Sequence, residues 1–193
     1  MYKIDLNTGN IYKENELGLT LVSPVQDSND INFIEYNAWA NLGNDPIPFI
    51  DEDLIRKINQ QNMWELIKSE RDRLKFSGVK VGEHWFHSDP DSRNQQLGLF
   101  TAAIAGQLPQ NAIMWKTLTV GGGLYDNIEV PMNTELAINI FVTTMMHDAT
   151  FHGASGYHRE QLLLAEDPTA YNYKVNWPES FESYREQQLA LLT

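Results

Sequence analysis

The sequence predicts an α+β fold, and three patterns along the chain predict it. Residues 1 to about 25 contain short runs in which apolar and polar side chains alternate, as in strands. Residues 53–76 repeat apolar side chains at helical spacing, and short strand and helix patterns mix after residue 79. We therefore expect a small antiparallel β-rich docking module over residues 1–48, a helical connector over 49–78 and an α+β module over 79–193.

Composition and charge narrow the classes of function. The 193 residues include 26 acidic and 14 basic side chains, which gives a formal net charge of −12. Nucleic-acid and anionic-membrane binding need clustered Lys and Arg, and the sequence has no such cluster, so we expect neither partner. No apolar run approaches the ~20 residues of a membrane span, and the N-terminus lacks the apolar core of a signal peptide. The absence of cysteine excludes disulfides, thiolate metal sites and cysteine nucleophiles.

Three short strands are expected in the N-terminal module. Residues 2–6 alternate, the Asn- and Gly-containing residues 7–10 predict a turn, and residues 11–13 form the returning strand. A third strand over residues 19–22 ends at a Ser-Pro pair. These strands predict an antiparallel meander that is marginal alone, because so small a module buries little surface.

A short helix and a long helix follow. Residues 32–42 place aromatic side chains near helical spacing, and Gly43 with the prolines after it predicts the end of that helix. We expect an extended linker between residues 43 and 53. Residues 53–76 have acidic side chains at the start and basic ones near the end, as the helix dipole favours. The polar residues 60–62 leave two shorter helices as an alternative.

The region after residue 79 begins with a hairpin and a capped helix. Residues 79–81 and 84–87 predict two strands joined by a two-residue turn. Asp89 is a natural N-cap with Pro90 at the first helical position, so a helix is expected over residues 90–105. Trp85 lies in the middle of the second strand, and we expect it to be buried against this helix or the 54–76 helix.

A second hairpin and further helices complete the chain. Residues 113–120 and 126–130 predict strands around a glycine turn at 121–123. Asn133 should cap a helix that runs to about residue 151. Glycines at 153 and 156 are expected to interrupt it before a short helix over residues 158–165. A terminal amphipathic helix is expected over residues 182–192.

Two groups of side chains could bind a metal ion. His147, His152 and His158 offer imidazole, a common metal ligand. Their spacing differs from the i, i+4 pair of a helical zinc site, so ordinary polar residues near a helix C-terminus are the alternative. Residues 83–91 hold two His and two Asp, but neighbouring strand positions point to opposite faces and Asp89 already serves as a cap.

Other motifs give little support for catalysis. Ser155 lies in a glycine-containing segment but lacks the GxSxG spacing of a serine hydrolase. The glycines at 121–123 are not followed by the helix that a phosphate loop requires. The five tryptophans are spread one per element, which suits core or interface anchors, with a carbohydrate platform as the alternative. We expect no cofactor.

Longer motifs resemble a known family. The motifs are Arg71-Asp72-Arg73-Leu74, Ser77-Gly78-Val79-x-Val81-Gly82, Trp85-Phe86-His87-Ser88-Asp89, Ser92-Arg93-x-Gln95-x-Leu97-Gly98, Trp115-Lys116-Thr117 and Val130-Pro131-Met132. Together they resemble the DUF4376 family over roughly residues 63–180. A second segment resembles one near the start of many phage tail and tail-fibre assembly proteins; it reads Phe33-x2-Tyr36-x2-Trp39-x3-Gly43-Asn44-x-Pro46-x-Pro48.

The resemblance implies a function through protein contact. DUF4376 proteins are common in tailed bacteriophages and prophages, usually beside tail-fibre genes, and the family brings no established catalytic residues. The resemblance therefore implies a non-enzymatic structural or adaptor component of the baseplate or tail fibre, or a tail-fibre assembly chaperone. Such a protein is made in the host bacterial cytoplasm and located in the virion tail. Its expected partners are tail-fibre or baseplate proteins and other copies of the chain.

Under this interpretation the N-terminal module is the docking part. Tyr36, Trp39, Pro46 and Pro48 are its expected protein-interface residues, since aromatic residues dominate interface hot spots. Packing of the two rings on the chain's own C-terminal module is the alternative. Two other functions stay open, a metal-dependent hydrolase that uses the three histidines and a carbohydrate-binding receptor module.

Overall fold

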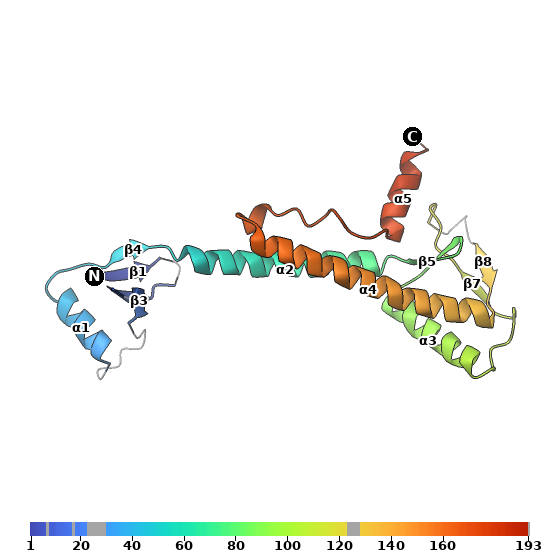
Figure 1. Cartoon of the computed structure of the whole chain (residues 1–193), viewed down its shortest axis with the longest axis horizontal. Coiled ribbons are helices and arrows are strands. Elements are labelled where there is room, and N and C mark those ends of the chain that lie inside the picture. Colours follow the sequence, from blue (N-terminus) through green and yellow to red (C-terminus); the bar gives the residue numbers. More distant parts are fainter. Residues whose placement is uncertain (7, 17, 23–29, 123–127, 193) are drawn as a thin grey trace. The chain divides into compact units, whose positions relative to one another are not determined.

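The fold combines helices and strands in two compact units. The computed structural model describes residues 1–6, 8–16, 18–22, 30–122 and 128–192. Its units are residues 1–58 and 59–193, and both are shown in Figure 1. Helices and antiparallel strands occur together along the chain, so the predicted α+β class is confirmed. None of the described helices is long and apolar enough to cross a membrane.

The first unit is built on a four-stranded sheet. β1 (Tyr2–Asp5), β2 (Ile11–Asn15) and β3 (Gly18–Leu21) form the antiparallel meander that the alternating pattern predicts. β4 (Ile47–Phe49) pairs in parallel with β1, which gives the order β3-β2-β1-β4. The linker expected between residues 43 and 53 therefore contains an edge strand. Pro48 is compatible with that position, because an edge strand need not donate every N–H to the ladder.

One helix packs against this sheet. In α1 (Ile31–Ala40) the Asp30 carboxylate caps the first turn by accepting hydrogen bonds from backbone N–H groups of residues 32 and 33. The ring centroids of Tyr36 and Trp39 lie 5.3 and 4.9 Å from the ring centroid of Tyr2 on β1. An ion pair between Lys13 and Glu35 joins the helix to β2 on the same side. α1 thus covers the sheet face that carries Tyr2.

The second unit contains two hairpins and most of the helical residues. α2 (Glu52–Lys75) begins in the first unit, and α3 (Pro90–Ile104), α4 (Thr134–Leu164) and α5 (Phe181–Ala190) follow it. β5 (Val79–Val81) pairs with β6 (His84–Phe86), and β7 (Met114–Lys116) pairs with β8 (Glu129–Pro131). A single 3₁₀ turn, Pro168–Ala170, follows α4. The predicted three-part division stays a prediction.

Two helices are more continuous than the sequence pattern indicates. α2 is one helix through the polar residues 60–62, and the break expected at 153–156 does not occur in α4. Gly153 and Gly156 each cost a helix about 1 kcal/mol relative to alanine. Phe151, Ser155 and His158 are buried along one side of α4, and this tertiary packing outweighs the local cost.

The core of the second unit has two parts. The larger joins the hairpins to α3 and α4, and its buried members are Val79, Phe86, Ala103, Leu108, Met132, Ala137 and Ile140. The smaller lies where α2 and α4 run side by side (Figure 1), and it contains Met63, Ile67 and Leu162. Trp64, Tyr171, Tyr173 and Trp177 cover this second part.

Trp85 and Asp89 behave largely as expected. Trp85 is buried, as predicted. Its aromatic neighbours are Phe181 and Tyr184 of α5 rather than residues of α2 or α3, and the ring centroids lie 5.6 and 5.5 Å from that of Trp85. Asp89 caps α3 by accepting hydrogen bonds from the backbone N–H groups of residues 91 and 92. The glycine turn predicted at 121–123 falls partly outside the described residues.

Gly78 lies close to Leu118 and Phe181, and this close approach supports a stability prediction. An added Cβ would lie 2.6 Å from Leu118 Cδ1 and 2.9 Å from Phe181 Cβ, at a φ of +155°. Gly78→Ala should therefore destabilise the fold by about 2–4 kcal/mol through overpacking and backbone strain. Gly82→Ala is the control, because φ is +60° there and nothing lies within 4 Å. It should cost about 1 kcal/mol in a urea titration. Equal costs at the two positions would refute the close approach.

Candidate functional site

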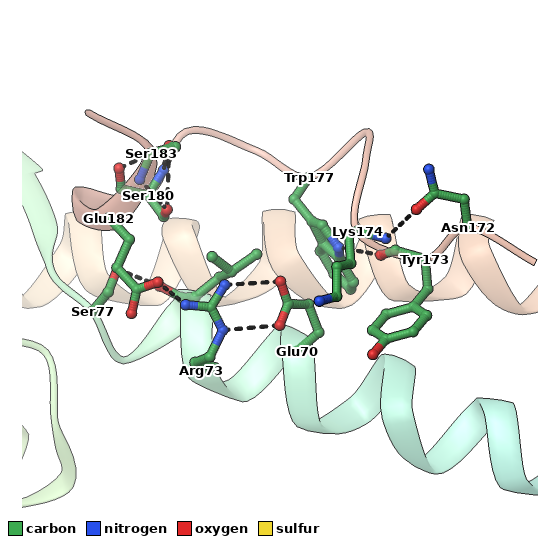
Figure 2. Close-up of polar contacts among 11 residues, drawn as sticks. Glu70, Arg73, Ser77, Asn172, Tyr173, Lys174, Trp177, Ser180, Glu182 and Ser183 are labelled. Atoms are coloured by element: carbon green, nitrogen blue, oxygen red, sulfur yellow. Dashed lines mark hydrogen bonds and ion pairs between the residues drawn. The ribbon is translucent and has the colours of Figure 1, made fainter. Parts of the chain in front are cut away.

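A polar groove lies between the second half of α2 and the returning segment 174–187. Its volume is about 420 Å³, and Figure 2 shows the polar contacts around it. The charged lining residues are the carboxylates of Glu70, Glu179, Glu182 and Glu186 and the cations of Arg73 and Lys174. Acidic side chains therefore outnumber basic ones in the groove, as they do in the chain.

Arg73 is the centre of the charged contacts. Its Nε and Nη2 atoms donate to the two carboxylate oxygens of Glu70 at 2.9 and 2.8 Å, and Nη1 contacts Glu182 (Figure 2). The hydrogen bond from Arg73 lowers the pKa of Glu70, and Glu70 in turn raises the pKa of Arg73. The arginine is thus held by two carboxylates, one from α2 and one from α5.

Aromatic contacts fix the wall formed by residues 171–177. Trp177 donates its indole N–H to the carbonyl of Tyr173 at 2.7 Å. The Trp177 ring stacks with Phe151 at 6.1 Å and lies 4.6 Å from His158. His158 Nδ1 lies 2.8 Å from the hydroxyl of Tyr171. The chain after α4 therefore folds back along that helix and packs on its buried side.

The opposite wall begins with the cap of α5. The buried Ser180 accepts a hydrogen bond from the backbone N–H of Ser183, and the Ser183 hydroxyl accepts one from the backbone N–H of Ser180. This capping box fixes the first turn of α5. Phe181 follows at once and packs on Trp85. Glu182 is thereby held beside Arg73.

The groove suits a basic group better than an anion. Its two cations lie among four carboxylates, and Arg73 is already paired. A Lys or Arg side chain from a partner would find carboxylate acceptors there. Across the described part of the chain, no group of three or more His, Asp or Glu side chains is arranged to hold a metal ion.

The three predicted metal ligands all lie on α4. His147 and His158 face the core side, whereas His152 is exposed. Because α4 is continuous, the eleven steps along the helix from His147 to His158 span about 16 Å. Burial lowers the pKa of His147 and of His158, and a backbone hydrogen bond with Val175 partly opposes the shift at His158. The helix does not bring the three rings together.

The predicted interface residues lie in the first unit. Tyr36 and Trp39 are half-buried against Tyr2, so their rings pack on the unit's own sheet. Pro48 is exposed within β4, and Pro46 just before it is half-buried. These four positions remain predicted docking residues. The groove was not predicted, because it forms only when residues 174–187 return to α2, and no local sequence pattern indicates that return.

Comparison with known families identifies the family to which the second unit is similar. The sequence profile described as Domain of unknown function (DUF4376) matches residues 58–175. The chain belongs to this family. The match begins one residue before the second unit and ends before α5, so Glu70, Arg73, Leu74 and Lys174 of the groove lie inside the match and the other lining residues follow it. No curated protein and no solved structure gives a significant match to the chain.

The buried histidines make stability depend on pH. The folded-state pKa of His147 lies below its unfolded value near 6.5, so below that pH the unfolded chain binds more protons and stability falls. The slope can reach about 1.4 kcal/mol per pH unit for each such histidine. Both ring nitrogens of His147 are buried without a hydrogen-bond partner. His147→Leu should therefore leave stability at pH 7 unchanged or higher and flatten the loss between pH 7 and 5.

The matched control is His87→Gln, which removes an exposed imidazole from the same unit. Urea titrations at pH 7, 6 and 5 give the comparison. The account fails if His147→Leu retains the full pH dependence of the unchanged protein.

Proposed function

We propose that the chain is a non-enzymatic bacteriophage tail protein that acts by protein–protein contact. It would serve as a structural or adaptor component of the baseplate or tail fibre, or as a tail-fibre assembly chaperone. Membership of DUF4376 supports this proposal through the phage-tail resemblance described above. The observation that carries it is a row of apolar and aromatic side chains on one sheet face of the first unit, beside an ion pair between Lys3 and Glu14.

Strand register defines that face. Leu21, Tyr12 and Ile47 stand in one cross-strand row, with Lys3 between the last two. Side chains at paired positions share a face of a sheet. Tyr12 and Phe49 meet on it at 5.4 Å between ring centroids. This row lies on the opposite face from Tyr2, against which α1 packs.

The edge strands make the face suitable for docking. β3 lies at one edge of the described sheet, and all four of its residues are exposed, including Leu19 and Leu21. An exposed edge offers unpaired backbone groups to an added strand, and apolar side chains beside it add affinity. A tail-fibre or baseplate segment could therefore extend the sheet at β3.

Mass spectrometry of purified virions, with affinity capture from infected cells, tests the proposal. Stoichiometric presence in virions supports a structural or adaptor role, and capture with a fibre protein but absence from virions supports a chaperone. Absence from virions, together with failure to capture a fibre or baseplate protein, would overturn the proposal. Leu19→Lys with Leu21→Lys should reduce capture at least tenfold, because lysines block edge pairing. Leu189→Lys, a matched change at an exposed leucine of α5, should leave it unchanged.

A further inference from the structure

Another cavity of the second unit is lined by basic rather than acidic side chains. It lies between residues 116–122 and the first turns of α5, and its volume is about 260 Å³. Its described lining residues are His87, Lys116, Thr117, Leu118, Thr119, Gly122, Phe181 and Arg185. None of them is Asp or Glu, although the chain has 26 acidic residues against 14 basic ones. We call this cavity the basic pocket, and its charge is opposite to that of the chain.

Backbone pairing fixes one wall of the basic pocket. Leu118 forms an antiparallel bridge with Trp85, and its N–H donates to the carbonyl of Trp85 at 2.7 Å. Antiparallel pairing sets residue 116 opposite residue 87, so Lys116 and His87 come from adjacent segments. The two side chains therefore line the same cavity although they lie 29 positions apart in the sequence.

Arg185 forms the opposite wall and is oriented by a turn. Its Nε atom donates to the carbonyl of Val120 at 3.0 Å. The N–H of Gly122 closes that turn on the carbonyl of Thr119 at 3.2 Å. Nη1 and Nη2 form no ion pair with a carboxylate of the described residues, so both nitrogens remain available as donors.

Lys116 and Thr119 also lack partners. The Lys116 ammonium group forms no ion pair with the described residues, whereas Lys3, Lys13 and Lys68 each contact a glutamate. The hydroxyl oxygen of Thr119 is buried and has no hydrogen-bond partner within the described chain. Buried polar groups of this kind are rare in folded proteins, and a bound ion or water is a usual explanation. Two unpaired cations and an unsatisfied hydroxyl thus belong to one cavity.

We propose that the basic pocket binds the phosphate group of a small organic molecule. A phosphate monoester carries a charge of about −1.5 to −2 at pH 7, which matches the two cations, and it offers three strong acceptor oxygens. Arginine and lysine are the side chains that bind phosphate best, by charge-assisted hydrogen bonds. Leu118 and Phe181 supply an apolar part of the lining, against which the organic part of the ligand would pack. The inference goes beyond the phage-tail proposal and does not depend on it.

An NMR titration of the full chain with phenyl phosphate tests the proposal. The ionic strength is held fixed, because salt screens exposed charges. The backbone amide signals of Leu118 and Gly122 should shift and saturate, and the signal of Gly153 on α4 should not move. Benzyl alcohol, which has the ring without the charge, should cause no such shifts, and benzoate should bind more weakly than phenyl phosphate.

Three results of this titration would overturn the proposal. The first is no shift at the pocket amides up to about 20 mM phenyl phosphate, a concentration well above a dissociation constant of about 1 mM. The second is equal shifts with benzyl alcohol, which would show that the charge plays no part. The third is benzoate binding as tight as that of phenyl phosphate, which would contradict the choice of a phosphate.

Paired variants locate the binding site. Lys116→Gln with Arg185→Gln should weaken phenyl phosphate binding at least about tenfold, because both charge-assisted contacts are lost. The control is Lys57→Gln with Arg159→Gln, which removes the same charge from two exposed positions outside the pocket and should leave the affinity unchanged. The amide spectrum without ligand checks each fold, and Lys116→Gln alone replaces the pocket pair if that variant unfolds. A folded pocket variant that keeps the affinity of the unchanged chain would also overturn the proposal.

Discussion

Arg93 holds three helical segments of the second unit together. Its Nη1 and Nη2 atoms donate to both oxygens of Asp148 on α4, and its Nε donates to the carbonyl of Ser88 just before α3. The guanidinium carbon also lies 4.9 Å from the ring centroid of Phe76, the residue just after α2. Burial alone would raise the pKa of Asp148, but Arg93 brings it below the ordinary value. The paired charge therefore fixes where α3 crosses α4.

Other features follow from that fixed crossing. With Arg93 on Asp148, the ring of Phe100 on α3 stacks on the ring of Phe141 on α4, with centroids 4.1 Å apart. The rest of α4 then runs beside α2, and its C-terminal half presents His158 to Tyr171 and Trp177. Those contacts set the path of the returning segment that walls the groove. α4 thus supports the segment that forms one wall of the groove.

Features set by neighbouring residues could be predicted, and those set by distant residues could not. Asp89 caps α3 because its carboxylate needs only the next turn, and the hairpin at 79–86 depends on a two-residue turn. β4 was missed because its partner, β1, lies some forty residues earlier and Pro48 argues against a strand. The predicted break in α4 was wrong because glycine propensity is local, whereas the burial of Phe151 and His158 depends on the fold. The groove forms only where α5 lies beside α2, and no sequence motif predicts that these two helices come together.

A double-mutant cycle on Arg93 and Asp148 tests the central interaction most directly. Urea unfolding at pH 7 of Arg93→Gln, Asp148→Asn and the double variant gives their coupling energy without reference to any partner. We expect a coupling of about 1–3 kcal/mol, as for contacting residues in one charged network. It should shrink as the pH falls through the lowered pKa of Asp148, because the protonated carboxyl loses its charge. A coupling below about 0.3 kcal/mol at pH 7 is within the additivity of independent sites and would contradict the account.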